Sequence, residues 1–90
     1  MASQPEILII IHRESCSVGR YVEMTTREIA EEYYGRIPSA EETSIISRVL
    51  IRLKENNAVK AIDEEGEKRK WKMTKSGKRW IEYKKEHDEI

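Results

Sequence analysis

The sequence predicts one domain of the α+β class, in which helices come first and a β-hairpin follows. With 90 residues the chain is long enough for one hydrophobic core and too short for two. Hydrophobic residues make up 38% of the chain and it has only two prolines, a composition typical of a folded protein. Its periodic segments occur in the order helix, short strand, helix, helix, two-stranded hairpin, helix.

The N-terminal part of the chain is predicted to form a helix and then a short strand. Pro5 suits the first turn of a helix and isoleucines follow it at helical spacing, so we expect a helix over about residues 5–14. The apolar run 7–11 is also compatible with a buried strand. Residues 15–19 are expected to form a loop, and the β-branched and aromatic residues of 20–24 predict a strand.

The second helix is expected over about residues 26–34. Thr25 and Glu28 have the spacing of a capping box, in which two side chains accept backbone N–H groups at the start of a helix. Gly35 is placed to take the left-handed conformation that ends a helix.

The third helix is expected over about residues 40–56. Ser39 and Glu42 repeat the capping-box spacing at its start. One stripe of this helix is apolar and is expected to face the core; it consists of Ile46, Val49, Leu50 and Leu53.

The remainder of the chain predicts a hairpin and a last helix. Residues 59–62 and 68–73 alternate in polarity as half-buried strands do, and the acidic segment 63–67 between them is expected to be a turn. Thr74 can cap a helix over about residues 75–89.

Charge is ordered along the chain although the total is zero. Residues 1–45 contain four bases and eight acids, residues 46–80 eleven bases and five acids, and residues 81–90 two bases and four acids, which gives −4, +6 and −2. A basic stretch of this kind can make one face positive and attract a phosphate backbone. It is also compatible with a merely solvated, salt-bridged surface.

Three segments carry a resemblance to a known family. They are residues 24–30 at the entry to the second helix, residues 47–55 leading to Val59, and residues 72–77, which have a hydrophobic-Thr-x-x-Gly pattern. In their order and spacing they resemble winged helix-turn-helix DNA-binding regulators, of the small archaeal or bacterial type related to the MarR, PadR and ArsR families. The resemblance covers about residues 5–90.

The resemblance implies an α+β winged helix-turn-helix fold with a three-helix core, a two-stranded wing and a C-terminal helix. The helix-turn-helix would span about residues 26–56, the wing about 58–73 and the C-terminal helix about 75–89. A transcriptional regulator that binds double-stranded DNA is then expected, with the third helix in the major groove and the wing on the backbone or in the minor groove. The chain lacks the second cysteine of ArsR-type metal sensors, so no metal site is expected.

On the third helix, the residues that point away from the apolar stripe are Ser44, Ser47, Arg48, Ile51 and Arg52. The polar ones among them, together with Lys54, are the candidate DNA contacts. Arg48 is the candidate base reader, because a guanidinium can meet guanine O6 and N7 together. Ser44 and Ser47 could contact bases or phosphates, and Arg52 and Lys54 are expected to contact the backbone.

Alternatively, Arg48 and Arg52 belong to a solvent-exposed surface that does not bind DNA. There they would form ion pairs with acids of the same helix such as Glu41 or Glu55. Glu41 and Glu42 near the helix start would also repel phosphates, and only Glu42 is explained by its capping role.

In the wing, Lys70 and Lys72 are expected on the outer face and Arg69 at the strand edge or tip, where they would contact phosphate or enter the minor groove. Trp71 is expected to pack inward, the alternative being stacking on single-stranded bases. The acids of the tip should keep the turn itself away from phosphate.

The last helix suggests a homodimer. Trp80, Tyr83, His87 and Ile90 are spaced by three, four and three residues, as in a heptad seam that could pair with a second copy. The isoleucine-rich first helix could complete that interface. Alternatively, the seam folds back to cover the core of the monomer.

No catalytic or cofactor motif occurs in the sequence, so we expect a binding protein and not an enzyme. The chain has no Gly-rich phosphate loop, and His12 and His87 are far apart. Cys16 is expected in the loop after the first helix, as an inert thiol or, if Arg13 or Arg20 favours its thiolate, as a redox sensor. His12 is expected on the surface at the helix end.

The sequence also bears on the setting of the protein. No apolar run approaches the roughly 18 residues of a membrane span. A single cysteine and the lack of a secretory signal favour the cytoplasm, and the excess of Glu and Lys over Asn and Gln is typical of thermophilic proteins. The alternative function is a winged-helix protein–protein interaction module that does not bind DNA.

Overall fold

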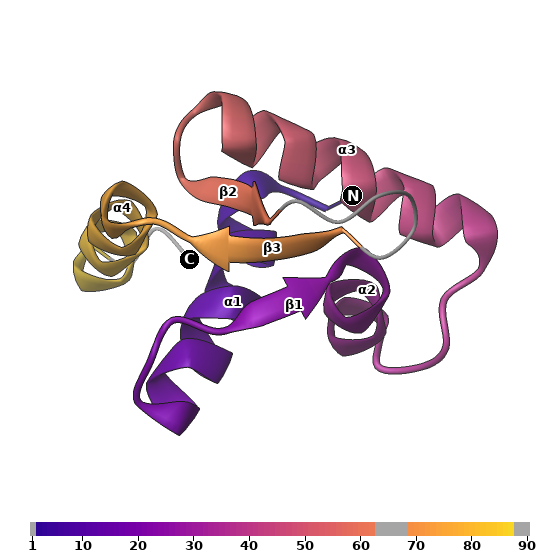
Figure 1. Cartoon of the computed structure of the whole chain (residues 1–90), viewed down its shortest axis with the longest axis horizontal. Coiled ribbons are helices and arrows are strands. Elements are labelled where there is room, and N and C mark those ends of the chain that lie inside the picture. Colours follow the sequence, from indigo (N-terminus) through magenta and orange to yellow (C-terminus); the bar gives the residue numbers. More distant parts are fainter. Residues whose placement is uncertain (1, 63–68, 88–90) are drawn as a thin grey trace.

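The computed structural model describes residues 2–62 and 69–87. Over these residues the chain is a small α+β protein with four helices and a three-stranded antiparallel sheet, an architecture compatible with a winged-helix-like fold (Figure 1). The elements in chain order are α1 (Gln4–Val18), β1 (Glu23–Thr25), α2 (Thr26–Tyr34), α3 (Ala40–Glu55), β2 (Val59–Ile62), β3 (Lys70–Met73) and α4 (Lys75–Glu86).

The capping boxes predicted for α2 and α3 are confirmed. The Thr25 hydroxyl accepts from the Glu28 backbone N–H at 3.1 Å, and the Glu28 carboxylate accepts from the Thr25 N–H at 2.9 Å. Ser39 and Glu42 make the same reciprocal pair at the start of α3. Gly35, with φ of 71°, ends α2 as expected.

The first helix is longer than predicted, and the loop expected over residues 15–19 is wrong. α1 continues to Val18 and ends at Gly19, which has φ of 73°. Ser15 does not stop the helix, because its hydroxyl faces inward and accepts from the Val22 backbone N–H at 3.3 Å. The helix also begins with a third capping box, formed by Ser3 and Glu6.

The predicted two-stranded wing is wrong, since β1 joins the hairpin to make a sheet of order β1-β3-β2. Met24 of β1 lies opposite Trp71 of β3, and Ala61 of β2 lies opposite Trp71 on its other side. The first strand covers Glu23–Thr25 and not residues 20–24, because pairing with the central strand decides which residues are extended.

Trp71 is part of the core, as predicted. Its side chain is 1% exposed, and its indole Nε1 donates to the Thr26 hydroxyl at 2.8 Å. Burial of both ring faces excludes the alternative in which Trp71 stacks on bases. The strand predicted from residue 68 is observed from Lys70, and the acidic tip at 63–67 lies outside the described residues.

The core is built around α1, which packs against α2, α3, α4 and β3. The apolar stripe predicted for α3 is confirmed as buried. On α1 the burial is broader than one stripe. Its buried hydrophobic residues are Ile7, Leu8, Ile9 and Ile11.

Gly77 lets α4 lie directly against the end of α3 and the start of β2. A Cβ on Gly77 would lie 2.0 Å from the Ala58 carbonyl oxygen, closer than any real contact. The same carbonyl accepts from the Thr74 backbone N–H at 3.0 Å, and the Thr74 hydroxyl accepts from the Gly77 N–H at 3.0 Å. The Thr-x-x-Gly pattern therefore joins a helix cap to a close backbone approach.

Replacing Gly77 with Ala should destabilise the protein, although Ala is the better helix former by about 1 kcal/mol. The clash of the new Cβ with the backbone of Ala58 is expected to cost about 1–3 kcal/mol. This cost exceeds the gain in helix propensity, so the net effect of the substitution is a loss of stability. Urea unfolding followed by tryptophan fluorescence measures the change in the free energy of unfolding, and Ser76→Ala at the exposed neighbouring position is the control. A G77A variant as stable as the native chain would refute this account of the motif.

Candidate nucleic-acid interface

A groove runs along α3 beside the N-terminal segment. Its polar lining consists of Ser44, Arg48, Arg52 and Glu41, and its apolar lining consists of Ala2, Ile45 and Val49. Both arginines are exposed. Of the other predicted contacts on α3, Lys54 is exposed and Ser47 is half-buried, and neither lines this groove.

The arginines of this groove have Glu41 as a neighbouring acid. In the part of the chain that the structure describes, neither Arg48 nor Arg52 forms an ion pair. The alternative pairing with Glu41 or Glu55 is therefore not observed among these residues. Glu41 remains the one acid in the groove.

Glu42 at the start of α3 is neutralised. Arg36, in the turn between α2 and α3, donates to both carboxylate oxygens, with Nη1 2.8 Å from Oε1. The hydrogen bond from Arg36 and then the backbone N–H of Ser39 lower the pKa of Glu42 from 4.5 to about 2. This acid is consequently both a helix cap and half of an ion pair, which reduces its repulsion of an approaching phosphate.

The outer face of the sheet carries a second basic group. Alternation along β3 buries Trp71 and Met73 and turns Lys70 and Lys72 to the other face, as predicted. Lys60 of β2 lies directly opposite Lys72 and is exposed. Sequence reasoning missed Lys60, although its place between Val59 and Ala61 in an alternating strand was the signal that could have found it.

Glu23 and Arg69 add charge next to the lysines of the outer sheet face. Glu23 of β1 lies opposite Lys72 on the other side of β3 and adds one acid to the row. The Arg69 guanidinium carbon is 5.9 Å from the centroid of the Trp71 ring, so this arginine packs on the edge of the core while staying exposed.

The two basic groups lie on neighbouring elements. α3 packs against β2, the strand that carries Lys60, and the two run alongside each other in Figure 1. Within each group, the residues assembled are those of the groove (Ser44, Arg48, Arg52) and those of the outer sheet face (Lys60, Lys70, Lys72).

The residues predicted as a dimer seam differ in their exposure. Trp80 is half-buried and packs against the core of its own chain. Tyr83 is 55% exposed, and its ring stacks on that of His87 with 4.0 Å between centroids. Ile90 lies outside the described residues.

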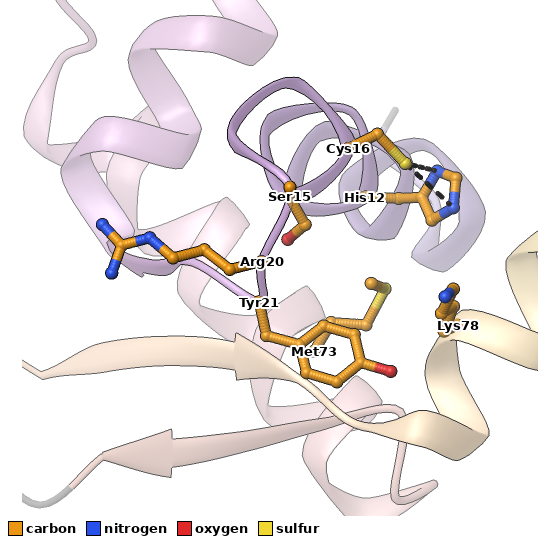
Figure 2. A pocket seen from close by; sticks show the side chains of 8 residues that line it. His12, Ser15, Cys16, Arg20, Tyr21, Met73 and Lys78 are labelled. Atoms are coloured by element: carbon orange, nitrogen blue, oxygen red, sulfur yellow. Dashed lines mark hydrogen bonds between the residues drawn. The ribbon is translucent and has the colours of Figure 1, made fainter.

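The surroundings of His12 and Cys16 differ from the prediction. Cys16 lies within α1 and not in a loop, and its thiol sulphur is 3.7 Å from Nε2 of His12 (Figure 2). His12 is 4% exposed and is not a surface group, because α4 covers that side of α1 and brings Glu82 Oε2 to 3.8 Å from its Nε2.

The described residues contain neither a cluster of metal ligands nor a helix suited to span a membrane. Across residues 2–62 and 69–87, no three His, Cys, Asp or Glu side chains come together in a way that could hold a metal ion. Among the helices of the same residues, none combines the length and the apolar character needed to span a bilayer. Comparison of the chain with protein-family models, with curated proteins and with solved structures gives no match in any of the three.

The Arg36–Glu42 pair predicts a pH dependence of stability. A carboxylate whose pKa is lower in the folded state stabilises the fold above its unfolded pKa of 4.5, and this contribution is lost as the pH falls from 4.5 toward about 2. The free energy of unfolding of Arg36→Ala should therefore be lower than that of the native chain at pH 6. This gap between the two free energies of unfolding should narrow below pH 4.5.

Urea unfolding of both proteins at a series of pH values measures this gap. Arg27→Ala, which removes a surface pair on α2 with a single 3.2 Å hydrogen bond to Glu31, is the matched control and should show a smaller gap at pH 6. A gap for Arg36→Ala that stays constant down to pH 2 would count against the pairing.

Proposed function

We propose that this protein is a winged helix-turn-helix transcriptional regulator that binds double-stranded DNA, and that it is not an enzyme. α2 and α3 would form the helix-turn-helix, and the three-stranded sheet β1-β3-β2 would form the wing. The observation that carries the proposal is a set of cations on three elements, α3, β2 and β3, that form no ion pair among the described residues of a chain with zero net charge: Arg48, Arg52, Lys60, Lys70 and Lys72.

In the proposed binding mode, α3 and the sheet contact different parts of the DNA. α3 would enter the major groove, where the exposed Arg48 can meet guanine O6 and N7 together and Ser44 can contact a base or a phosphate. Arg52 and Lys54 would contact the backbone beside the groove. Lys70, Lys72 and Lys60 would meet phosphates or the minor groove, with Arg69 nearer the tip.

Replacing Arg48 with Ala should reduce discrimination between DNA sequences, because a bidentate contact to guanine is worth about 1–3 kcal/mol against the wrong base. Sites selected from random duplex DNA by the native protein provide the target, and fluorescence anisotropy compares this target with a duplex altered at single positions. Sequence preference that is unchanged in R48A would remove Arg48 from the base-reading role.

Replacing Lys70 or Lys72 with Ala should instead weaken binding to every duplex alike. Each lost phosphate contact is expected to reduce the slope of log K against log salt by about 0.9. Lys75→Ala, an exposed lysine at the start of α4, is the matched control and should leave the slope unchanged. No affinity for any duplex at low salt would refute the DNA-binding proposal.

We further propose that the protein acts as a homodimer through α4. Tyr83 and His87 would meet their counterparts in a second copy, with Trp80 at the edge and Ile90 extending the seam. Two α3 helices would then reach half-sites about one DNA turn, 34–36 Å, apart. The exposed Tyr83 and its stacked partner support this seam.

Tyr83→Asp should convert the dimer to a monomer, because it places a charge in the apolar seam at a position that is exposed in the single chain. Sedimentation equilibrium measures the mass, with Lys75→Asp as the control. A native chain that sediments as a monomer would refute the dimer while leaving DNA binding open.

The second candidate function is a winged-helix module that binds another protein. It is favoured by Ile37, 72% exposed in the turn between α2 and α3, and by Ile51, 41% exposed on α3. Apolar side chains there suit a protein partner better than phosphate.

A further inference from the structure

A cavity of about 540 Å³ lies between the end of α1, the loop after it, β3 and α4. Its volume falls within the range of roughly 300–1,000 Å³ typical of small-molecule sites. It is formed by residues far apart in the sequence, from His12 to Lys78. Neither of the functions proposed above uses it.

The walls of this cavity suit a flat apolar body. Figure 2 shows the Tyr21 ring and the Met73 thioether on one side, with His12 and Cys16 on the opposite side. An aromatic ring and a polarisable sulphur facing an imidazole form surfaces against which a planar molecule packs well.

Among residues 2–62 and 69–87, the lining of the cavity has cationic side chains and no acid, and Glu82 lies next to this lining, with its Oε2 3.8 Å from His12 Nε2. The Lys78 ammonium is 6.0 Å from the centroid of the Tyr21 ring, and Lys78 forms no ion pair within the described parts of the chain. Arg20 contributes its aliphatic stem, since its guanidinium points away from His12 in Figure 2. The charge available to a ligand is therefore chiefly that of Lys78.

His12 adds a buried polar group to the same cavity. Burial first, and then the charges of Lys85 and Lys78, lower the pKa of His12, while Glu82 acts in the opposite direction. His12 is consequently neutral near pH 7, and a neutral imidazole can donate one hydrogen bond to a ligand.

We propose that this cavity binds a small organic carboxylate with a planar apolar body. The carboxylate would pair with the Lys78 ammonium, and the body would lie between the Tyr21 and Met73 wall and His12. A charge-assisted pair next to an apolar wall is the arrangement expected for such an anion. This inference does not depend on DNA binding, because none of these residues belongs to the basic groups.

Cys16 makes the proposal testable, because it is the single cysteine of the sequence, is exposed and lines the cavity. A bound ligand should shield it from iodoacetamide. The probes are 2-naphthoate and its uncharged analogue 2-naphthamide, and alkylation of the native chain is followed by mass spectrometry. We expect severalfold slower alkylation with 2-naphthoate and little change with 2-naphthamide at the same concentration.

Lys78→Gln should weaken protection by 2-naphthoate about tenfold, the loss expected for one charge-assisted hydrogen bond. Lys75→Gln removes an exposed lysine of the same helix that does not line the cavity, and should leave protection unchanged.

Three outcomes would overturn the proposal. The first is that 2-naphthoate at millimolar concentration does not protect Cys16 from alkylation, and the second is that 2-naphthamide protects it equally well. The third is that Lys78→Gln and Lys75→Gln lose the same amount of protection. The comparison of the two probes uses the native chain, so it does not depend on whether a variant folds. Measuring DNA affinity of the same preparations separates failure of this site from failure of the proposed DNA-binding function.

Discussion

The burial of Trp71 on the central strand is the constraint on which the rest of the structure depends. Its ring fills the core, and its indole N–H bonds to Thr26 at the start of α2, so one side chain ties the sheet to the helices. Because neighbouring residues of a strand face opposite sides, an inward Trp71 obliges Lys70 and Lys72 to face outward. The basic face of the sheet is thus a consequence of packing the core.

The arrangement of charge explains how a chain with no net charge can present basic surfaces. Arg36 neutralises Glu42 at the start of α3, while Glu41 shares the groove with Arg48 and Arg52. Acids are used in caps and local pairs, while the cations of α3 and the outer sheet face have no such partners among the residues described. Local pairing, more than total charge, decides which face is positive.

The central strand also links the two candidate sites. Lys72 faces outward in the basic group, and the next residue, Met73, faces the cavity between α1 and α4. The cavity exists because Gly77 allows α4 to approach the backbone at Ala58, which brings Lys78 over Tyr21. The residues of one strand therefore contribute alternately to the basic sheet face and to the solvent-open cavity.

The sequence by itself determined the element types and order, the two capping boxes, the stripe of α3 and the outward lysines of β3. Each of these depends on residues within a few positions of one another, where hydrogen bonding and side-chain period are the controlling physics. Only the tertiary structure decided that β1 pairs with β3, that α1 continues past Ser15, and that His12 is buried beside Cys16. Those features require partners distant in the chain, and periodicity carries no information about which distant segment supplies them.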